Sequence, residues 1–304
     1  MALMAMLFWG ISYVWTKIVF EFYQPVTIMF IRLSISSLMM LGILRLRGET
    51  LFIERKDRLN FVYLAFFSPF CYFLGENYGL LHVSPTVASV IIATIPLFAP
   101  ILGFIGFREK LTWVNMIGFL VSFGGIWVMV LDQSFRFSAS PKGVLMLFFA
   151  VAAALVNMLF LKKLARKYSP YHIIFVQNSL GALMFFPVFM LFEFNMFIHI
   201  RPSSSAIFSL LALALFGSSL AFVFYTASVR TLGIARTSIF GNLIPIFTAI
   251  TSLIILKEVI DGAKLAGMAL VITGLFMTQV STIRKKRHRH NHQQHAQKNG
   301  KPIL

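Results

Sequence analysis

Residues 77–129 read NYGLLHVSPTVASVIIATIPLFAPILGFIGFREKLTWVNMIGFLVSFGGIWVM. Two apolar runs, at 85–107 and 113–131, are separated by a short charged stretch that contains Arg108 and Lys110. A helix needs about 20 apolar residues to cross a hydrocarbon core that is ~30 Å thick. Each run is therefore long enough to cross a bilayer, and Pro96 interrupts the first of them.

The same pattern of apolar runs and short polar breaks extends over nearly the whole chain. The further runs cover 2–20, 25–44, 59–81, 143–161, 171–192, 206–229, 235–256 and 263–281. Backbone inside lipid must satisfy its own hydrogen bonds, and none of these runs has the alternating pattern of a barrel strand. The sequence therefore predicts an all-α polytopic membrane protein with ten transmembrane helices.

Composition and charge agree with a membrane protein. Of the 304 residues, 58% are hydrophobic and 12% are charged, whereas soluble domains average about 45–50% and about 25%. The net charge of +17 does not indicate nucleic-acid binding, because the basic residues lie at the ends of apolar runs and in the tail. With the N-terminus inside, most of them fall in inside loops, which predicts an inner-membrane protein with both termini in the cytoplasm.

An internal repeat divides the chain. A shift of 149 residues places Pro96 on Pro245, and it also aligns Gly118 with Gly267, Gly125 with Gly274 and Glu109 with Glu258. A shift of 145 places Lys17 and Pro25 on Lys162 and Pro170. Five spans in each half would give the halves opposite orientations in the membrane. We predict inverted repeats at 1–131 and 141–281, followed by a basic, His-rich cytoplasmic tail at 282–304 that is disordered.

The repeated segments resemble a known family. The stretch at 77–129, its counterpart ARTSIFGNLIPIFTAITSLIILKEVIDGAKLAGMALVITGLFM at 235–277, and FWGISYVWTKIVFEFYQPVTIMFIR at 8–32 are similar to the EamA repeat of the drug/metabolite transporter superfamily. The shared pattern is a helix of small residues with a central proline and a terminal glutamate, followed by a glycine-bearing helix. The resemblance implies ten helices, inverted repeats, a central cavity, and efflux or exchange of small metabolites.

Two charged residues fall deep within predicted spans. Arg32 lies in the second span, where a charge costs about 2.5–3.5 kcal/mol on insertion scales and should face protein or water. It is a candidate anchor for a carboxylate or phosphate, and the alternatives are snorkelling or a structural pair. Glu76 lies in the third span, one turn after Tyr72, and is a candidate proton carrier or a partner for Arg32.

Polar and aromatic residues on other helices complete the candidate substrate site. Trp9, Ser12, Tyr72, Asn157, Tyr225 and Asn242 could contact a solute, although each isolated polar group is more often an interhelical hydrogen bond. Pro96 and Pro245 release backbone carbonyls, which fits either a gate or hinge or a simple packing kink.

The sequence contains no motif for catalysis or for nucleotide hydrolysis. There is no GxxxxGK[ST] or HExxH, and a single cysteine, Cys71, excludes a disulfide framework. We expect no catalytic residue, metal site or cofactor. We predict a secondary transporter that exports or exchanges a small organic metabolite, an amino acid or related solute, by alternating access. An intramembrane enzyme and a non-transporting scaffold or receptor are the alternatives. A proton or solute counter-ion and a homodimer are left open.

Overall fold

The computed structural model describes residues 1–49, 51–98, 113–131 and 139–298, and the elements within these ranges are helices. In chain order they are α1 (Ala2–Phe20), α2 (Pro25–Leu46), η1 (Arg55–Asp57), α3 (Arg58–Ala65), η2 (Phe66–Cys71), α4 (Tyr72–His82), α5 (Pro85–Ala93), α7 (Trp113–Val130), α8 (Pro141–Leu164), α9 (Pro170–Phe192), α10 (Phe194–Phe197), α11 (Ser204–Ala212), η3 (Leu213–Leu220), α12 (Ala221–Leu232), α13 (Ile234–Phe240), η4 (Gly241–Leu243), α14 (Ile244–Thr251), η5 (Ser252–Leu256) and α15 (Gly262–Lys298).

Eight helical stretches in the described ranges are long and apolar enough to cross a membrane. They are Ala2–Phe20, Pro25–Leu46, Trp113–Val130, Pro141–Leu164, Pro170–Phe192, Ser204–Leu232, Arg236–Leu256 and Gly262–Val280. The third predicted span is formed by α3, η2 and α4 and breaks at Ser68, and the fourth is the shorter helix Pro85–Phe98. The fold is therefore all-α and polytopic, as predicted.

Prolines begin several of these helices. Pro25, Pro85, Pro141 and Pro170 each occupy the first turn of a helix, where the missing N–H has no helical partner and the fixed φ suits the helix. Ser84 and Ser169 precede two of them, and their hydroxyls accept from the N–H groups of Val87 at 3.4 Å and His172 at 3.2 Å. The Ser-Pro pairs in the sequence therefore fix where α5 and α9 begin.

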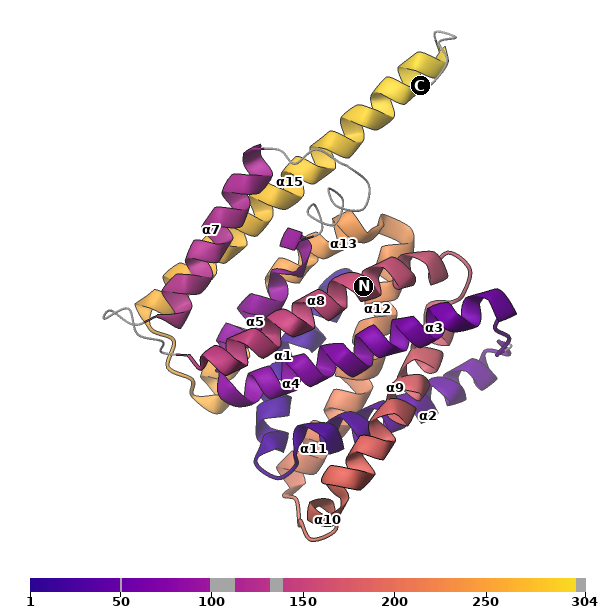
Figure 1. Cartoon of the computed structure of the whole chain (residues 1–304), viewed down its shortest axis with the longest axis vertical. Helices are drawn as coiled ribbons and strands as arrows, with labels where there is room; N and C mark the ends of the chain where they lie inside the picture. Colours follow the sequence, from indigo (N-terminus) through magenta and orange to yellow (C-terminus); the bar gives the residue numbers. More distant parts are fainter. Residues whose placement is uncertain (50, 99–112, 132–138, 299–304) are drawn as a thin grey trace.

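Helices α7 and α15 pack side by side and run antiparallel (Figure 1). A Cβ atom added to Gly118 would lie 2.6 Å from the carbonyl oxygen of Gly274, and one added to Gly125 would lie 2.6 Å from that of Gly267. Backbone therefore contacts backbone along this pair, a packing that small residues permit in membranes.

Helices α2 and α9 form a second antiparallel pair, held by polar contacts. The Asn178 amide donates to Ser36 Oγ at 2.7 Å. At the other end, the buried carboxylate of Glu193 accepts from the N–H groups of Val26 at 3.3 Å and Thr27 at 2.6 Å. Glu193 follows α9 and caps the start of α2, because the first N–H groups of a helix have no partner within it.

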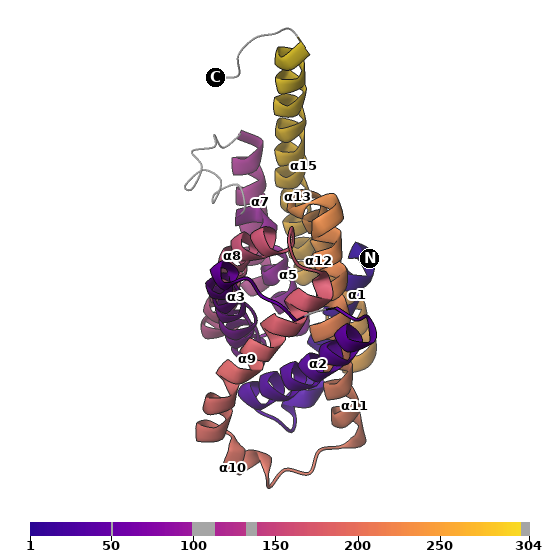
Figure 2. The same ribbon diagram turned by 90° about the vertical axis from the view of Figure 1, so that its right-hand side faces the viewer.

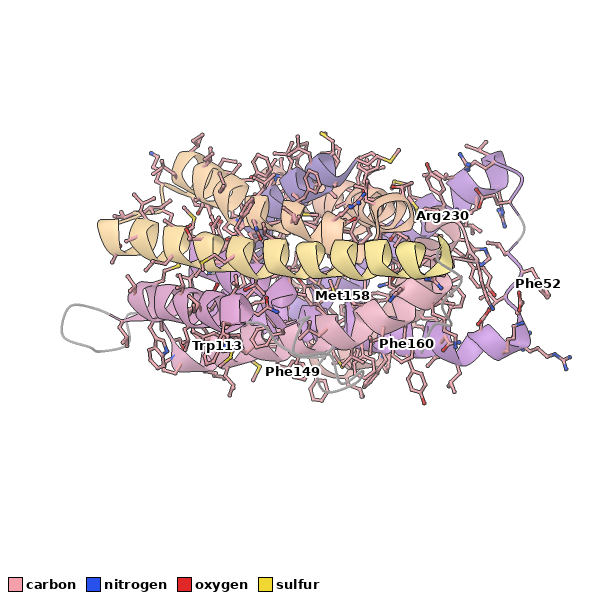
Figure 3. The ribbon with its side chains drawn as sticks, turned by 90° about the horizontal axis from the view of Figure 1, so that it is seen from above. Phe52, Trp113, Phe149, Met158, Phe160 and Arg230 are labelled. Atoms are coloured by element: carbon pink, nitrogen blue, oxygen red, sulfur yellow. The ribbon has the colours of Figure 1, made fainter. Side chains whose placement is uncertain are left out.

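The remaining helices surround the centre of the molecule (Figures 1 and 2). Helix α4 packs against α8, and α1 packs against α11, α12 and α14. The outer face of the bundle is strongly apolar: Trp113 is 79% exposed and Phe149 is 47% exposed, and both lie at the edge of the molecule in Figure 3. An exposed apolar face of this kind fits contact with lipid.

Helix α15 extends far beyond the bundle (Figure 1). It continues through Gly262–Lys298 without a break. The expectation of a disordered tail is therefore wrong for the part up to Lys298. The residues after Thr282 are rich in Arg, Lys, His and Gln, and several of these are favourable helix formers that can extend a helix that packing has already begun.

A polar cluster joins the start of α3 to the turn between α8 and α9. The buried carboxylate of Asp57 accepts from Lys167 Nζ at 2.8 Å and from the Tyr168 hydroxyl at 3.1 Å. The hydrogen bond from Lys167 is the main cause that lowers the pKa of Asp57 below its ordinary value, and the bond from Tyr168 adds to it.

We predict that this cluster stabilises the protein only while Asp57 is charged. Because the pKa of Asp57 is lowered in the folded state, the cluster adds to the free energy of unfolding above the ordinary aspartate pKa. This stabilisation is lost as the pH falls through the folded-state pKa. Asp57→Asn should lower the apparent Tm in detergent at neutral pH, and the difference from wild type should shrink under acid. Glu54→Gln is the control, because Glu54 is 42% exposed and lies 3.8 Å from Lys167. Equal losses in both variants would contradict the prediction.

Candidate functional site

A cavity of about 120 Å³ lies at the centre of the bundle. Its lining comes from α1, α2, η2, α4, α8, α12 and the region of α13 to α14, together with the helix that begins at Pro85. The predicted site residues that line it are Trp9, Ser12, Arg32, Tyr72, Glu76, Pro96, Asn157 and Tyr225. Asn242 and Pro245 are not among the lining residues.

The Glu76 carboxylate is held at one oxygen. Tyr72 and Tyr13 both donate their hydroxyls to Glu76 Oε1, at 2.6 and 2.9 Å. Among the described residues no group donates to Oε2. This second oxygen is therefore available to a proton or to a donor on a bound solute.

Arg32 is buried, at 3% exposure, and faces the same cavity. Its Nε donates to Ser218 Oγ at 2.6 Å, and its guanidinium carbon lies 4.6 Å from the centre of the Phe73 ring. A Cβ on Gly217 would come within 3.3 Å of Arg32 Nη2, so the glycine leaves room for the guanidinium group. Neither Nη atom donates to a described residue, which leaves the planar end of the group available to an anion.

Arg32 and Glu76 both line the cavity but do not form an ion pair with each other. The ion pairs between described residues lie elsewhere in the protein. Ser218 holds the Arg32 guanidinium group, whereas Tyr13 and Tyr72 hold the Glu76 carboxylate. The alternative that Glu76 is a direct ion-pair partner of Arg32 is therefore wrong for this structure.

Asn157 has a structural task beside the cavity. Ser68, with φ −151° and ψ 123°, interrupts the third span next to Pro69. The Asn157 amide donates to the carbonyl oxygens of Leu64 at 2.8 Å and Ser68 at 3.4 Å, and Gln177 donates to Ser68 at 2.7 Å. Side-chain amides thus satisfy carbonyls that the break frees from the helix.

Aromatic rings form one wall of the cavity. The Trp9 ring centre lies 5.1 Å from that of Tyr225 and 5.0 Å from that of Phe222. The Trp9 indole donates to the carbonyl of Gly217 at 3.3 Å. Ser12 donates to the Trp9 carbonyl at 2.6 Å, so its proton is used within α1. The wall offers an apolar surface to a solute.

Asn242 lies away from this cavity. Its amide donates to Gln279 Oε1 at 3.0 Å, and Gln279 donates back to Asn242 Oδ1 at 3.2 Å. The reciprocal pair ties η4 to α15, which is an interhelical hydrogen bond of the usual membrane type.

Both prolines follow short departures from α-helix. The segment before Pro245 is the 3₁₀ helix η4, and a turn at Thr94 precedes Pro96. Pro96 lines the cavity, whereas Pro245 is buried beside it.

Two residues that hold the charged groups of the cavity were not predicted from the sequence. Tyr13 lies one helical turn after Trp9 and contacts Glu76, and the spacing of four residues from Trp9 could have indicated a shared helix face. Ser218 holds Arg32 across 186 residues of chain, and a local pattern gives no signal for such a contact.

The described residues hold no group of three His, Cys, Asp or Glu side chains that could bind a metal ion.

Comparisons with known proteins agree on one family. The sequence pattern of the EamA-like transporter family matches residues 1–131 and 141–280. An uncharacterized transporter of Archaeoglobus fulgidus is 26% identical over 270 residues, which cover 89% of this chain and 94% of that protein.

Two relatives have names that include a solute. A probable terminal-alkyne amino-acid exporter of Streptantibioticus cattleyicolor is 26% identical over 217 residues and covers 69% of each chain. An S-adenosylmethionine uptake transporter of Rickettsia prowazekii is 27% identical over 198 residues, or 64% of this chain and 63% of that protein.

A solved crystal structure superposes with a TM-score of 0.67 at 16% sequence identity, covering 93% of this chain and 96% of that one, so the two share a fold. The family match spans nearly the whole chain outside the tail, and the apolar helices are those of a protein that crosses the bilayer several times. The resemblance seen in the sequence is confirmed: this chain belongs to the EamA-like transporter family, and it is a multi-pass membrane transporter.

Proposed function

We propose that the protein is a secondary transporter that exports or exchanges an amino acid or related solute by alternating access. The observation that carries the proposal is the central cavity, where Arg32 has free guanidinium nitrogens and Glu76 has a free carboxylate oxygen. Charged groups inside a membrane are expensive and mark solute or proton pathways. Helices of both halves of the chain contribute to this cavity.

Contacts between α7 and α15 support two halves related by a two-fold axis. The repeat aligns Gly118 with Gly267 and Gly125 with Gly274. Gly118 contacts Gly274. The repeat counterparts of these two residues are Gly267 and Gly125, and they also contact each other. Such mutual exchange is what a two-fold axis between the halves requires.

The pair α2 and α9 supports the same relation independently. With the shift of 145 residues, Ser36 corresponds to Gly181 and Leu33 to Asn178. Asn178 donates to Ser36, and a Cβ on Gly181 would lie 3.2 Å from the Leu33 side chain. These two contacts are again counterparts. We therefore propose inverted repeats at 1–131 and 141–281, as in other carriers that alternate access around a central site.

The same correspondence supports a functional role for the charge on Arg32. Arg32 corresponds to Gln177. Arg32 Nε donates to the Ser218 hydroxyl in the π-helical segment η3, and the Gln177 amide donates to the Ser68 backbone carbonyl in the π-helical segment η2. A neutral amide thus holds the corresponding segment in one half, although it contacts a different atom. The positive charge in the other half is available for recognising an anionic group on a solute.

The central cavity is small in the present conformation. At about 120 Å³ it is below the roughly 300–1,000 Å³ of ordinary ligand pockets. A solute therefore requires the two halves to move apart, and the helix breaks before Pro96 and Pro245 are the candidate hinges. Two relatives are named for an amino acid and for S-adenosylmethionine. Both solutes contain an amino group and a carboxylate, which suits a cavity that contains one cationic and one acidic side chain.

We predict that equivalent positions of the two halves face opposite sides of the membrane. Glu21 and Arg166 are related by the shift of 145 and are both exposed. In a Cys71→Ser background, an impermeant maleimide should label Glu21→Cys in intact cells, and it should label Arg166→Cys only after the cells are opened. This result would also place both termini in the cytoplasm, as the distribution of basic residues predicts. Labelling of both positions from one side would contradict inverted repeats.

We predict that Glu76 couples transport to protons. In proteoliposomes, wild-type flux of a radiolabelled amino acid should saturate and rise with a proton gradient. Glu76→Gln keeps the acceptor for both tyrosines but cannot release a proton, so the ratio of flux with and without the gradient should fall to about one. Undiminished gradient dependence would refute the assignment. Chemical conversion of the solute would instead favour an intramembrane enzyme, and no saturable flux would favour a scaffold.

We predict that Arg32 binds the anionic group of the solute. Arg32→Lys and Arg32→Gln should each weaken the affinity for an anionic or zwitterionic solute by about tenfold or more, since hydrogen bonds to charged groups contribute ~1.5–3 kcal/mol. Arg32→Gln imitates Gln177 and should leave thermal stability close to wild type, which is the control for folding. An unchanged affinity in a folded Arg32→Gln protein would rule out the anchor.

A further inference from the structure

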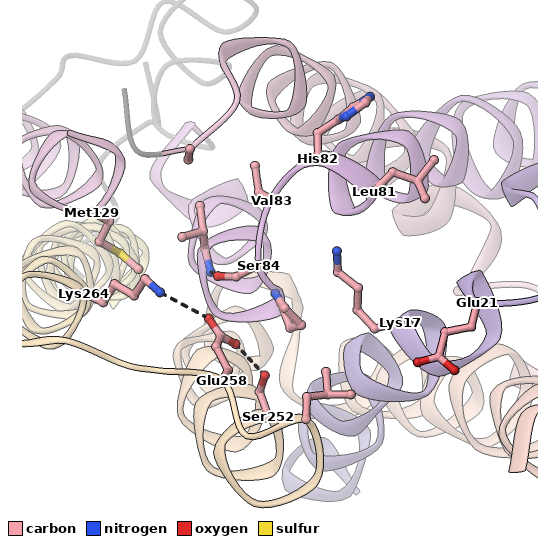
Figure 4. Close-up of a pocket in the computed structure, with 14 residues that line it drawn as sticks. Lys17, Glu21, Leu81, His82, Val83, Ser84, Met129, Ser252, Glu258 and Lys264 are labelled. Carbon is pink, nitrogen blue, oxygen red and sulfur yellow. Dashed lines mark hydrogen bonds and ion pairs between the residues drawn. The ribbon is translucent and has the colours of Figure 1, made fainter. Parts of the chain in front are cut away.

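A second cavity of about 520 Å³ opens beyond the central one, at the end of α1 that carries Lys17 and Glu21. It is bounded by the junction of α4 with α5, the end of η5 and the start of α15 (Figure 4). Lys17 lies one helical turn after Tyr13 on α1, about 6 Å further along the axis. Tyr13 lines the central cavity and Lys17 lines the outer one, so the two spaces follow each other along α1.

Glu258 is fixed in the wall of this outer cavity. Lys257 adopts a left-handed conformation with φ 52°, which ends η5 and turns the chain. Thr86 and Ser252 then donate to Glu258 Oε2 at 2.9 and 2.5 Å. The side chain is 9% exposed, and its Oε1 forms an ion pair with Lys264 Nζ at 3.8 Å but accepts no hydrogen bond. A buried carboxylate with an unsatisfied oxygen is expensive unless a donor reaches it.

Lys17 lies across the cavity from Glu258 (Figure 4). Its ammonium group makes no hydrogen bond or ion pair with a described residue, and it lines the same cavity as Glu258. The cavity therefore has an unpaired cation on one side and an incompletely satisfied anion on the other. The other titratable lining residues are Glu21, His82 and Lys264.

The rest of the lining is largely apolar. Leu81, Val83, Val87, Met129 and Leu256 contribute hydrocarbon side chains. The volume lies within the roughly 300–1,000 Å³ range of small-molecule sites. A ligand that fits this lining has one negative group, one positive group and an apolar body.

We propose that this outer cavity is a second solute site, in which Lys17 binds the carboxylate and Glu258 the ammonium group of a zwitterion with an apolar side chain. The inference rests on the proposed function, since it assigns a substrate class to the carrier. A zwitterion bound to Lys17 would lie about one helical turn along α1 from Tyr13, which lines the central cavity and donates to Glu76. The outer site would thus hold solute next to the central one.

The test compares three probes on the purified full-length protein in nanodiscs by titration calorimetry. L-leucine carries both charged groups, L-leucinamide lacks the carboxylate, and isocaproate lacks the ammonium group. Leucine should bind about tenfold or more tightly than either, because each lost charged contact contributes ~1.5–3 kcal/mol. Lys17→Gln should remove the advantage over leucinamide, and Glu258→Gln should remove the advantage over isocaproate. Lys17→Gln should still bind leucinamide, and Glu258→Gln should still bind isocaproate. This remaining binding shows that each variant is folded.

Glu21→Gln is the matched control, because Glu21 lines the same cavity and is exposed. The proposal is overturned if the three probes bind alike, if none binds, or if Lys17→Gln and Glu258→Gln lower leucine affinity no more than Glu21→Gln does. It is also overturned if both variants slow flux without changing the relative affinities of the three probes, since Lys17 and Glu258 would then form a gate.

Flux in proteoliposomes separates this failure from failure of the proposed function. One outcome is that the wild-type protein shows saturable flux of a solute while Lys17→Gln and Glu258→Gln leave the probe preference unchanged. This outcome would refute the second site and leave the transporter assignment intact. Absence of saturable flux for every solute would refute the proposed function itself.

Discussion

Every backbone N–H and C=O group inside a bilayer needs a partner within the protein, and this requirement accounts for the most informative contacts of the structure. Where the third span breaks at Ser68, Asn157 and Gln177 supply the missing donors. Where η3 departs from α-helix, Ser36 and Asn178 donate to the Ser218 carbonyl, and the Ser218 hydroxyl holds Arg32. The irregular segments therefore bring polar side chains to the centre of an apolar protein, and the candidate site is built on them.

Much of the fold could be predicted because its signals are local. Long apolar runs define the spans, and the prolines at positions 25, 85, 141 and 170 mark where helices begin. Matching glycines at a fixed shift indicated the internal repeat, whereas the close packing of the helices that carry them is a finding of the structure. These features depend on composition and on periods within a single helix, which a sequence displays directly.

The candidate site was only partly predictable, because its geometry depends on contacts between distant segments. Charge within a span singled out Arg32 and Glu76, yet their partners Ser218 and Tyr13 belong to other helices. Asn242 is as polar as Asn157, but it faces α15 rather than the cavity. The rotation of a helix around its axis decides such outcomes, and a helix that is apolar on all sides gives little indication of it. Helix α15 continued through the basic tail for a related reason, since an existing helix extends more easily than a new one starts.

The glycine contacts of α7 and α15 also restrict how the protein can move. Each backbone occupies the space where the other helix would carry a side chain, so a small axial slip would drive carbonyl groups into one another. Packed surfaces of this kind change between discrete arrangements and do not deform continuously. Because α7 and α15 come from different halves of the chain, this pair would act as the pivot in the proposed alternating access, with the helices around the two cavities moving most.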